Sequence, residues 1–394
     1  MMLHLPPSEN RTHATANTLS PKGSFVTLEK FLQAMIQHGA SDLFFSAGAP
    51  VGINIEGRTR FLGEHRLSAA ETRQIAYSVM NDKQSAEFEH EMEMNLALAL
   101  DGIGRFRVNV FRQRGSVAMV VRHIKSEVPS IEELNLPPKL RELVMVPRGL
   151  VLVVGSTGSG KSTTLASMID HRNTKRSGHI LTIEDPVEFL HQHKRSIVDQ
   201  REVGLDTKSY EIALKNAMRE APDVILIGEI RDRQTMQHAL AYAETGHLCL
   251  STLHANNANQ TLDRIINFFP ETAHRQLFVD LSLHLQAIIS QRLIPSTDGM
   301  RVPAVELLLR TPYIADLIQK GEIHGIKDAM KDGSQHGMMT FDQSLYKLFE
   351  EGKINEEEAL EHADSRNDLG LNIRMSREQS PHDTPDAWKI NPNF

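Results

Sequence analysis

The stretch that decides the fold runs from Leu150 to Ser162 and reads LVLVVGSTGSGKS. Its first five residues form an unbroken apolar run, which is typical of a parallel strand covered on both faces. The last eight fit the pattern GxxxxGK[ST], in which glycines let the backbone fold so that its N–H groups point at a phosphate. A helix to about Arg172 is expected to follow, with its positive end toward the anion. We therefore expect a nucleoside triphosphate site, for ATP with Mg²⁺.

Two side chains of this loop have defined tasks in the motif. Lys161 brings a full positive charge to the β- and γ-phosphates, and the Ser162 hydroxyl is a ligand for Mg²⁺. The other residues expected to contact the nucleotide are Gly155, Ser156, Thr157, Gly158, Ser159, Gly160 and Thr163. A purely structural loop is the alternative, and the strand before the loop and the helix after it disfavour that alternative.

The chain after the loop alternates apolar strands with helices. Strands are predicted at 180–183, 224–227 and 248–253, and helices at 209–220 and 234–245. Alternating units of this kind form an open parallel α/β sheet. Beyond the last of these strands we expect helices only.

The chain before the loop has the pattern of a small α+β domain. It begins with a helix that ends before Gly39, and strands are predicted at 43–45 and 51–55. A helix at 69–89 and a hairpin at 105–124 complete the domain.

The boundaries between these parts follow from composition, since prolines and polar residues mark linkers and ends. We predict a disordered leader at 1–24, an α+β domain at 25–125, a proline-rich linker at 126–148, an α/β domain with C-terminal helices at 149–366, and a tail at 367–394.

Acidic residues follow two of the predicted strands. Glu229 comes just after strand 224–227, where the carboxyl ends of parallel strands face the ligand crevice, so it could polarise a water that attacks the γ-phosphate. A glutamate salt-bridged to Arg231 is the alternative. Glu184 and Asp185 follow strand 180–183 and suit Mg²⁺ or its waters, unless they are solvated acids of a turn.

Basic groups near the site are less decisive. His254 follows strand 248–253 and could hydrogen-bond the γ-phosphate, although a lone histidine is more often structural. Arg105, Arg107 and Arg122 lie on the hairpin of the first domain, which has no phosphate loop. They form either a solvated polar face or arginine fingers that reach a nucleotide from beside it.

Composition narrows the classes of protein. The net charge of about −7 argues against a nucleic-acid surface, because phosphate backbones attract clustered Lys and Arg. The single cysteine, Cys249, excludes a disulfide framework and a Cys-based zinc site. No apolar run approaches the roughly 18 residues that a membrane span needs, so no transmembrane segment is expected.

Several motifs together resemble the secretion-type ATPases that drive type IV pili, in the PilT/PilU retraction group. The likeness covers roughly residues 27–370 and depends on the order of its motifs. Those motifs are Ala40-Ser41-Asp42-Leu43, Gly104-Arg105-Phe106-Arg107-Val108-Asn109, the phosphate loop, Ile183-Glu184-Asp185-Pro186-Val187-Glu188, Ile227-Gly228-Glu229-Ile230-Arg231-Asp232, Glu244-Thr245-Gly246-His247-Leu248 and Ser251-Thr252-Leu253-His254-Ala255.

This resemblance implies a PAS-like first domain, a RecA-like second domain and a ring of six subunits with ATP between neighbours. Glu229 would be the catalytic base and His254 the His-box histidine. Arg107 and Arg122 match positions that contact the γ-phosphate. The expected setting is the cytoplasmic side of the inner membrane at the pilus base, with a platform protein and a PilT-like paralogue as partners and no nucleic acid.

Departures from the family pattern favour the PilU branch. The C-terminal AIRNLIRE-like signature of the retraction group appears only as residues 313–319, without its two arginines. Phe44 replaces the more usual histidine, and the tetracysteine element of the extension ATPases is absent. Three functions therefore remain open: a retraction motor for twitching motility, a nucleotide-binding scaffold ring stacked on PilT, and a RecA-like nucleic-acid motor.

Overall fold

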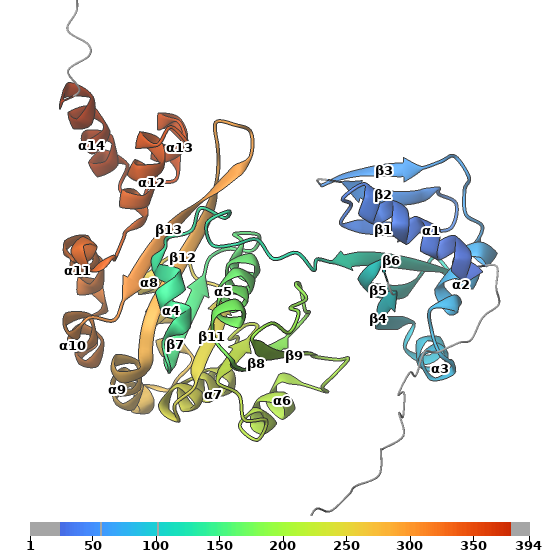
Figure 1. Ribbon diagram of the computed structural model, residues 1–394, viewed down its shortest axis with the longest axis horizontal. Helices are drawn as coiled ribbons and strands as arrows, with labels where there is room; N and C mark the ends of the chain where they lie inside the picture. The colour runs from blue at the N-terminus through green and yellow to red at the C-terminus, as the bar shows by residue number, and fades with distance from the viewer. Residues whose placement is uncertain (1–23, 56, 101, 380–394) are drawn as a thin grey trace, which may run out of the picture. The chain divides into compact units, whose positions relative to one another are not determined.

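The computed structural model of the chain describes residues 24–55, 57–100 and 102–379 (Figure 1). The chain divides between Ile124 and Lys125 into two compact units. The predicted leader lies outside the described residues except for Ser24, and so does the end of the predicted tail, 380–394. None of the helices in the described part of the chain is long and apolar enough to cross a membrane.

The described part of the first unit contains a six-stranded antiparallel sheet and three helices, and the strand order is β3-β2-β1-β6-β5-β4. The elements are α1 (Ser24–Gln37), β1 (Asp42–Phe45), β2 (Val51–Ile55), β3 (Arg58–Leu62), α2 (Ala69–Ser78), α3 (Asp82–Glu91), β4 (Glu93–Leu100), β5 (Gly104–Gln113) and β6 (Ser116–Ile124).

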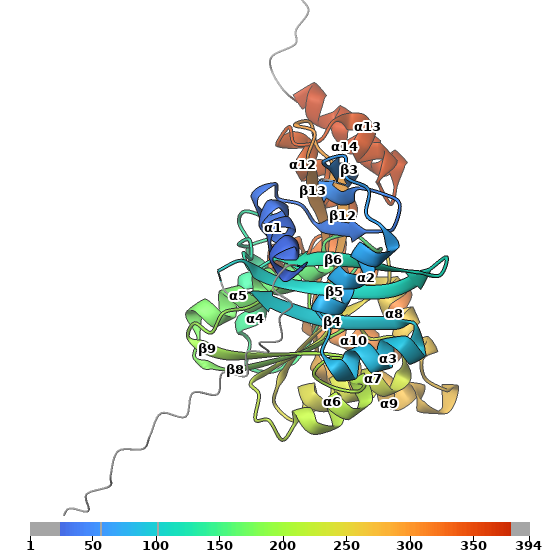
Figure 2. The ribbon, with the colours of Figure 1, turned by 90° about the vertical axis from the view of Figure 1, so that its right-hand side faces the viewer.

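Strict alternation along β5 decides which face of this sheet is buried. Phe106, Val108 and Val110 are fully buried and pack with residues of α1 and α2, which cover that face (Figure 2). The predicted hairpin is present as β5 and β6. The predicted helix at 69–89 is instead two helices, because the side chain of Asn81 caps a new helix N-terminus in a capping box with Gln84.

The second unit contains a seven-stranded sheet in the order β13-β12-β7-β11-β10-β8-β9, in which only β13 is antiparallel to its neighbour. The strands are β7 (Gly149–Val154), β8 (Gly178–Glu184), β9 (Ser196–Glu202), β10 (Val224–Ile227), β11 (Leu248–Leu253), β12 (Leu285–Pro295) and β13 (Arg301–Leu309). The predicted fold class is confirmed: a RecA-like parallel sheet with a P-loop, preceded by a small α+β domain.

Helices cover this sheet and continue beyond it. They are α4 (Lys139–Met145), α5 (Lys161–Lys175), α6 (Tyr210–Ala217), α7 (Arg233–Glu244), α8 (Ala258–Asn267), α9 (His274–His284), α10 (Pro312–Lys320), α11 (Ile326–Asp332), α12 (Phe341–Glu350), α13 (Glu356–Glu361) and α14 (Arg366–Gln379). The last three gather beside the β12–β13 hairpin, where they share a small separate core with Ile294 and Val302 (Figure 1).

Three segments of the second unit differ from what the sequence predicts. The region after residue 253 is not only helical, because β12 and β13 form a long hairpin on the edge of the sheet. The segment 126–148 is not a linker, since Ile131, Leu140 and Val144 are buried in the core of the second unit. The predicted tail at 367–394 begins too early: α14 buries Leu369 and Ile373 against the C-terminal helices.

Register places the functional segments at one edge of the sheet. Val154 pairs with Leu253, Ser251 with Ile227, and Ile227 with Ile183. The loops that follow β7, β11, β10 and β8 therefore emerge side by side at the carboxyl edge of the sheet, where open α/β sheets bind ligands.

Candidate functional site

The loop between β7 and α5 adopts a shape that only glycine permits at two positions. Gly160 has a φ of 89°, in the left-handed region. A Cβ on Gly155 would lie 2.4 Å from the Ser159 hydroxyl and 2.5 Å from the carbonyl oxygen of Gln291. The loop is therefore packed from behind and open in front, where it borders a cavity of about 450 Å³ that we call the P-loop cavity.

The predicted nucleotide-contacting residues do not all face this cavity. Thr157, Gly158, Gly160, Lys161, Ser162 and Thr163 line it. Gly155 and Ser156 line a neighbouring groove beside α8, and the Ser159 side chain is buried within the loop.

Lys161 begins helix α5 and has its ammonium group folded onto the loop. Its Nζ donates to the carbonyl oxygens of Gly155 at 3.0 Å and of Ser156 at 2.8 Å. Burial lowers the pKa of Lys161, while the negative charges of Glu229 and Glu188 oppose that shift. The ammonium group is thus held by two carbonyl oxygens of the loop at the border of the cavity, where the charges of two nearby carboxylates favour its protonated form.

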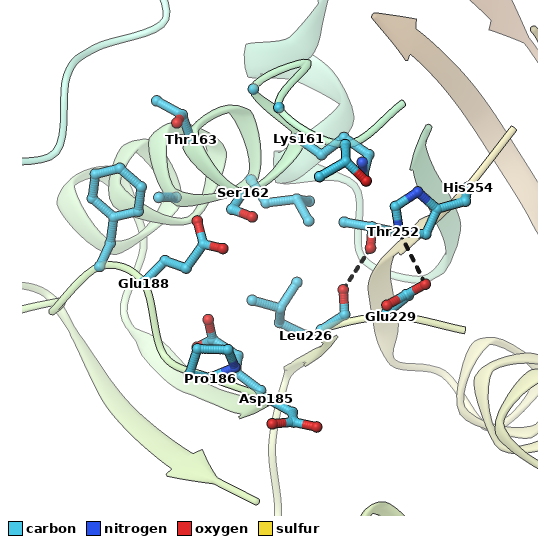
Figure 3. Close-up of a pocket in the computed structure, with 18 of the residues that line it drawn as sticks. Lys161, Ser162, Thr163, Asp185, Pro186, Glu188, Leu226, Glu229, Thr252 and His254 are labelled. Atoms are coloured by element: carbon cyan, nitrogen blue, oxygen red, sulfur yellow. Dashed lines mark hydrogen bonds and ion pairs between the residues drawn. The ribbon is translucent and has the colours of Figure 1, made fainter. Parts of the chain in front are cut away.

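Glu229 lies just beyond β10, with both carboxylate oxygens engaged. Oε2 accepts a hydrogen bond from Nε of Arg231 at 2.7 Å, and Oε1 lies 3.2 Å from Nε2 of His254 (Figure 3). The Thr252 hydroxyl donates to the carbonyl oxygen of Gly228 at 2.7 Å and so ties the start of this loop to β11. The predicted base and the predicted histidine are therefore direct neighbours, and the salt bridge to Arg231 is also present.

The acidic segment after β8 is arranged differently from the prediction. Oε1 of Glu184 accepts from the Thr182 hydroxyl at 2.6 Å and from Gln200 at 3.3 Å, and burial raises the pKa of Glu184 to about 7. The Asp185 carboxylate points away from Ser162, whereas the Glu188 carboxylate points toward it (Figure 3). Glu188 is thus better placed than Glu184 or Asp185 for a metal beside Ser162.

Other cavity residues gave no readable signal in the sequence. They are Phe189, Tyr210 from the start of α6, and Leu293 and Arg301 from the β12–β13 hairpin. The hairpin was expected to be helical, so its contribution was missed. Glu188 was visible as part of an acidic motif, but nothing in its spacing separated it from Asp185.

The hairpin arginines lie on the first unit, on the face of the sheet opposite its core. Arg107 on β5 and Arg122 on β6 are direct cross-strand partners, and Arg122 pairs in turn with Asp42 on β1. Nε of Arg122 donates to Asp42 at 2.7 Å. Burial alone would raise the pKa of Asp42, but the hydrogen bonds from Arg122, Ser41 and Asn54 lower it overall. The Asp42 carboxylate therefore holds the Arg122 side chain, while Arg107 lies directly across from Arg122 on the neighbouring strand and Arg105 lies two residues away along β5.

Comparison with known proteins identifies the family. The family model of the type II/IV secretion system protein matches residues 19–327. The type IV pilus ATPase PilU of Pseudomonas aeruginosa is 54% identical over 351 residues, which are 89% of this chain and 92% of that protein. The chain belongs to the PilT/PilU group of the type II/IV secretion ATPases.

Two further relatives agree with this assignment. The type IV pilus retraction ATPase PilT of the same organism is 43% identical over 336 residues, 85% of this chain and 98% of that protein. A crystal structure of the pilus retraction motor PilT with bound ADP has a TM-score of 0.81 to this chain and 44% sequence identity. The superposition covers 87% of this chain and 98% of the PilT chain. This member of the PilT/PilU group is accordingly a nucleotide-binding ATPase.

Proposed function

We propose that this ATPase is a motor for type IV pilus retraction, and hence for twitching motility, that works as a homohexamer. The observation that carries the proposal is the Lys161, Glu229 and His254 cluster around the P-loop cavity, in a chain 54% identical to PilU. We place the ring on the cytoplasmic side of the inner membrane at the pilus base, with the platform protein as its partner there.

Lys161 and the loop bind the triphosphate in this proposal. The ammonium group exchanges its two carbonyl contacts for the β- and γ-phosphate oxygens, and the loop N–H groups and the start of α5 add further donors. Because the loop N–H groups and the start of α5 are fixed before the ligand arrives, they stabilise phosphate charge without reorganisation, and only the Lys161 ammonium has to change partners.

Glu229 acts as the general base. Its carboxylate orients a water for attack on the γ-phosphate, and His254, 3.2 Å away, reports on the phosphate or hydrogen-bonds it. Arg231 holds the other carboxylate oxygen and so fixes the rotamer of the base. Positioned bases contribute about 10²- to 10⁴-fold in rate.

Mg²⁺ fits this site only together with a nucleotide. No group of three His, Cys, Asp or Glu side chains that could hold a metal occurs in the part of the chain that the structure describes. Mg²⁺ usually needs just one or two protein ligands besides phosphate oxygens and waters. Ser162 and Glu188 would supply them, and the ion would neutralise phosphate charge during transfer.

Arg107 and Arg122 serve the triphosphate of a neighbouring subunit in this proposal. Both side chains are on a face free of core packing, and Asp42 holds Arg122 ready without covering its guanidinium, since the Arg122 side chain is 67% exposed. Arginine fingers of this kind are worth about 10³- to 10⁵-fold in rate.

A second candidate function is an accessory ring that acts with a PilT-like paralogue and needs no turnover of its own. Two observations favour it: the identity is higher to PilU than to PilT, and α10 lacks both arginines of the retraction signature. The accessory ring does not require catalysis by Glu229, whereas the motor does.

Pilus retraction in cells distinguishes the two candidates. A strain that lacks this chain but has active PilT is complemented with wild type or with Glu229→Gln, and twitching zones are measured. The motor proposal predicts that Glu229→Gln restores little or no motility at wild-type protein levels. Full restoration would support the accessory ring and exclude the motor role for this subunit.

A further inference from the structure

Gln291 lies directly behind the P-loop, on a strand that no sequence motif connects to it. β12 runs parallel to β7 with Ser290 opposite Val154, so the next residue, Gln291, stands beside the first glycine of the loop. Its carbonyl oxygen would be 2.5 Å from a Cβ on Gly155. Gln291 is only 4% exposed, so its amide needs partners inside the protein.

The side chain of Gln291 reaches the first turn of α5. The Thr164 hydroxyl donates to Oε1 of Gln291 at 2.7 Å, across 127 residues of sequence, and Nε2 lies 2.9 Å from where a Cβ of Gly160 would be. The backbone N–H of Thr164 in turn donates to the carbonyl oxygen of Gly160 at 2.9 Å. Gln291 therefore contacts the beginning of the loop through its backbone carbonyl, and the end of the loop and the following helix through its buried side-chain amide.

The Thr164 hydroxyl could donate its hydrogen bond elsewhere, so its choice of Gln291 is a specific feature of this fold. A helical threonine commonly bonds the carbonyl oxygen three or four residues earlier, which here is within the P-loop. Donation to Gln291 keeps the hydroxyl away from those carbonyls and pins α5 to β12. Without Gln291, the buried hydroxyl must turn back toward the loop or stay unpaired.

We propose that Gln291 is a positioning residue for nucleotide binding. Through Thr164 and the two glycines, it holds the loop in the conformation whose N–H groups receive the phosphates. The inference rests on the proposed ATP site, which gains affinity from such preorganisation because no ordering of the loop is then needed on binding.

The test is a double-mutant cycle read out as ATP affinity. Full-length protein carrying Gln291→Met, Thr164→Val or both is titrated with ATP and Mg²⁺ by calorimetry. Each single variant is expected to bind about tenfold more weakly, since a buried partner loses its hydrogen bond. The double variant should be little worse than either single one, because the two groups act as a unit.

Two variants separate positioning from general damage. Thr164→Ser keeps the hydroxyl and should bind ATP like wild type. Gln286→Met changes another glutamine of β12, whose side chain packs on Gly149 at the far end of β7, and should also leave affinity unchanged. The melting temperature without nucleotide is measured for all variants to identify any that are poorly folded.

Three results would overturn the inference: wild-type affinity in folded Gln291→Met and Thr164→Val, losses that simply add in the double variant, or an equal loss in Gln286→Met. The proposed function fails separately, if wild type itself binds no ATP or if Lys161→Ala binds it as tightly as wild type does.

Discussion

Gly228 is the residue where the structure makes its sharpest prediction, because Glu229 follows it directly. A Cβ added at Gly228 would lie 2.8 Å from the Tyr210 hydroxyl, 3.2 Å from Cα of Glu184 and 3.3 Å from the carbonyl oxygen of Ile183. Two of these neighbours are backbone atoms of β8, which is paired on both sides and cannot withdraw.

The magnitude follows from these contacts. Overpacking by one methyl group typically costs about 1–3 kcal/mol of stability, so Gly228→Ala should lower the melting temperature by several degrees. The loop carrying Glu229 must also shift, and a displacement approaching 1 Å at a positioned base lowers kcat by up to about 100-fold.

Tyr210→Phe provides the matched control. It removes the hydroxyl that makes the shortest contact but leaves the two backbone contacts, so Gly228→Ala in a Tyr210→Phe background should regain part of the lost stability and part of the lost kcat. Denaturant unfolding and steady-state ATP hydrolysis measure both quantities. A Gly228→Ala variant with wild-type stability and kcat, or no rescue by Tyr210→Phe, would refute the reasoning.

Three further predictions concern the frame around the site. Glu184→Gln should flatten the pH dependence of stability between pH 4.5 and 7. The pKa of the Glu184 carboxyl is raised from 4.5 to about 7, so this group favours folding only while it is protonated. The unfolding free energy of the wild type should therefore fall by roughly 3 kcal/mol as the pH rises through that window. If the wild-type and variant unfolding curves keep a constant separation over this range, the assigned shift is wrong. Leu140→Ala should lower the unfolding free energy of the second unit by about 2–5 kcal/mol in denaturant, whereas Glu142→Ala on the same helix should change that free energy little. Equally small effects of both substitutions would mean that residues 126–148 are a linker after all. Asp364→Asn should loosen the C-terminal helices, because the Asp364 carboxylate pairs with Arg292 at 2.8 Å and with Lys327 at 3.0 Å. Burial alone would raise the pKa of Asp364, but these two partners lower it overall, so the stabilisation is lost as the pH falls through the carboxyl range. Unchanged hydrogen exchange in α13 and α14 of the variant would contradict this prediction.

Much of the site was predictable because its parts follow strands in sequence. The loop after β7, Glu229 after β10 and His254 after β11 each come directly after a buried apolar run. Once those runs are recognised as neighbouring parallel strands, their following residues must meet at one edge. Strand order and chain direction alone therefore place these segments at one edge, whereas the 3.2 Å contact between Glu229 and His254 depends on side-chain directions that the sequence does not encode.

The failures have equally local causes. β12 is buried on both faces, so it lacks the alternation that separates strand from helix, and Gln291 and Leu293 were missed with it. The choice between Asp185 and Glu188 depends on which way the turn after β8 directs each side chain, and spacing does not encode that direction. Prolines in 126–148 indicated a linker, but Leu140 and Val144 lie on one face of α4 and are fully buried.

The central claim is that Glu229 activates water in a site where Lys161 and the P-loop hold ATP. Its most direct test is the steady-state rate of ATP hydrolysis by purified Glu229→Gln protein, with ATP affinity measured on the same sample. We expect wild-type affinity together with a rate at least about 10²-fold lower than wild type. Hydrolysis at the wild-type rate by the variant would contradict the assignment of the base.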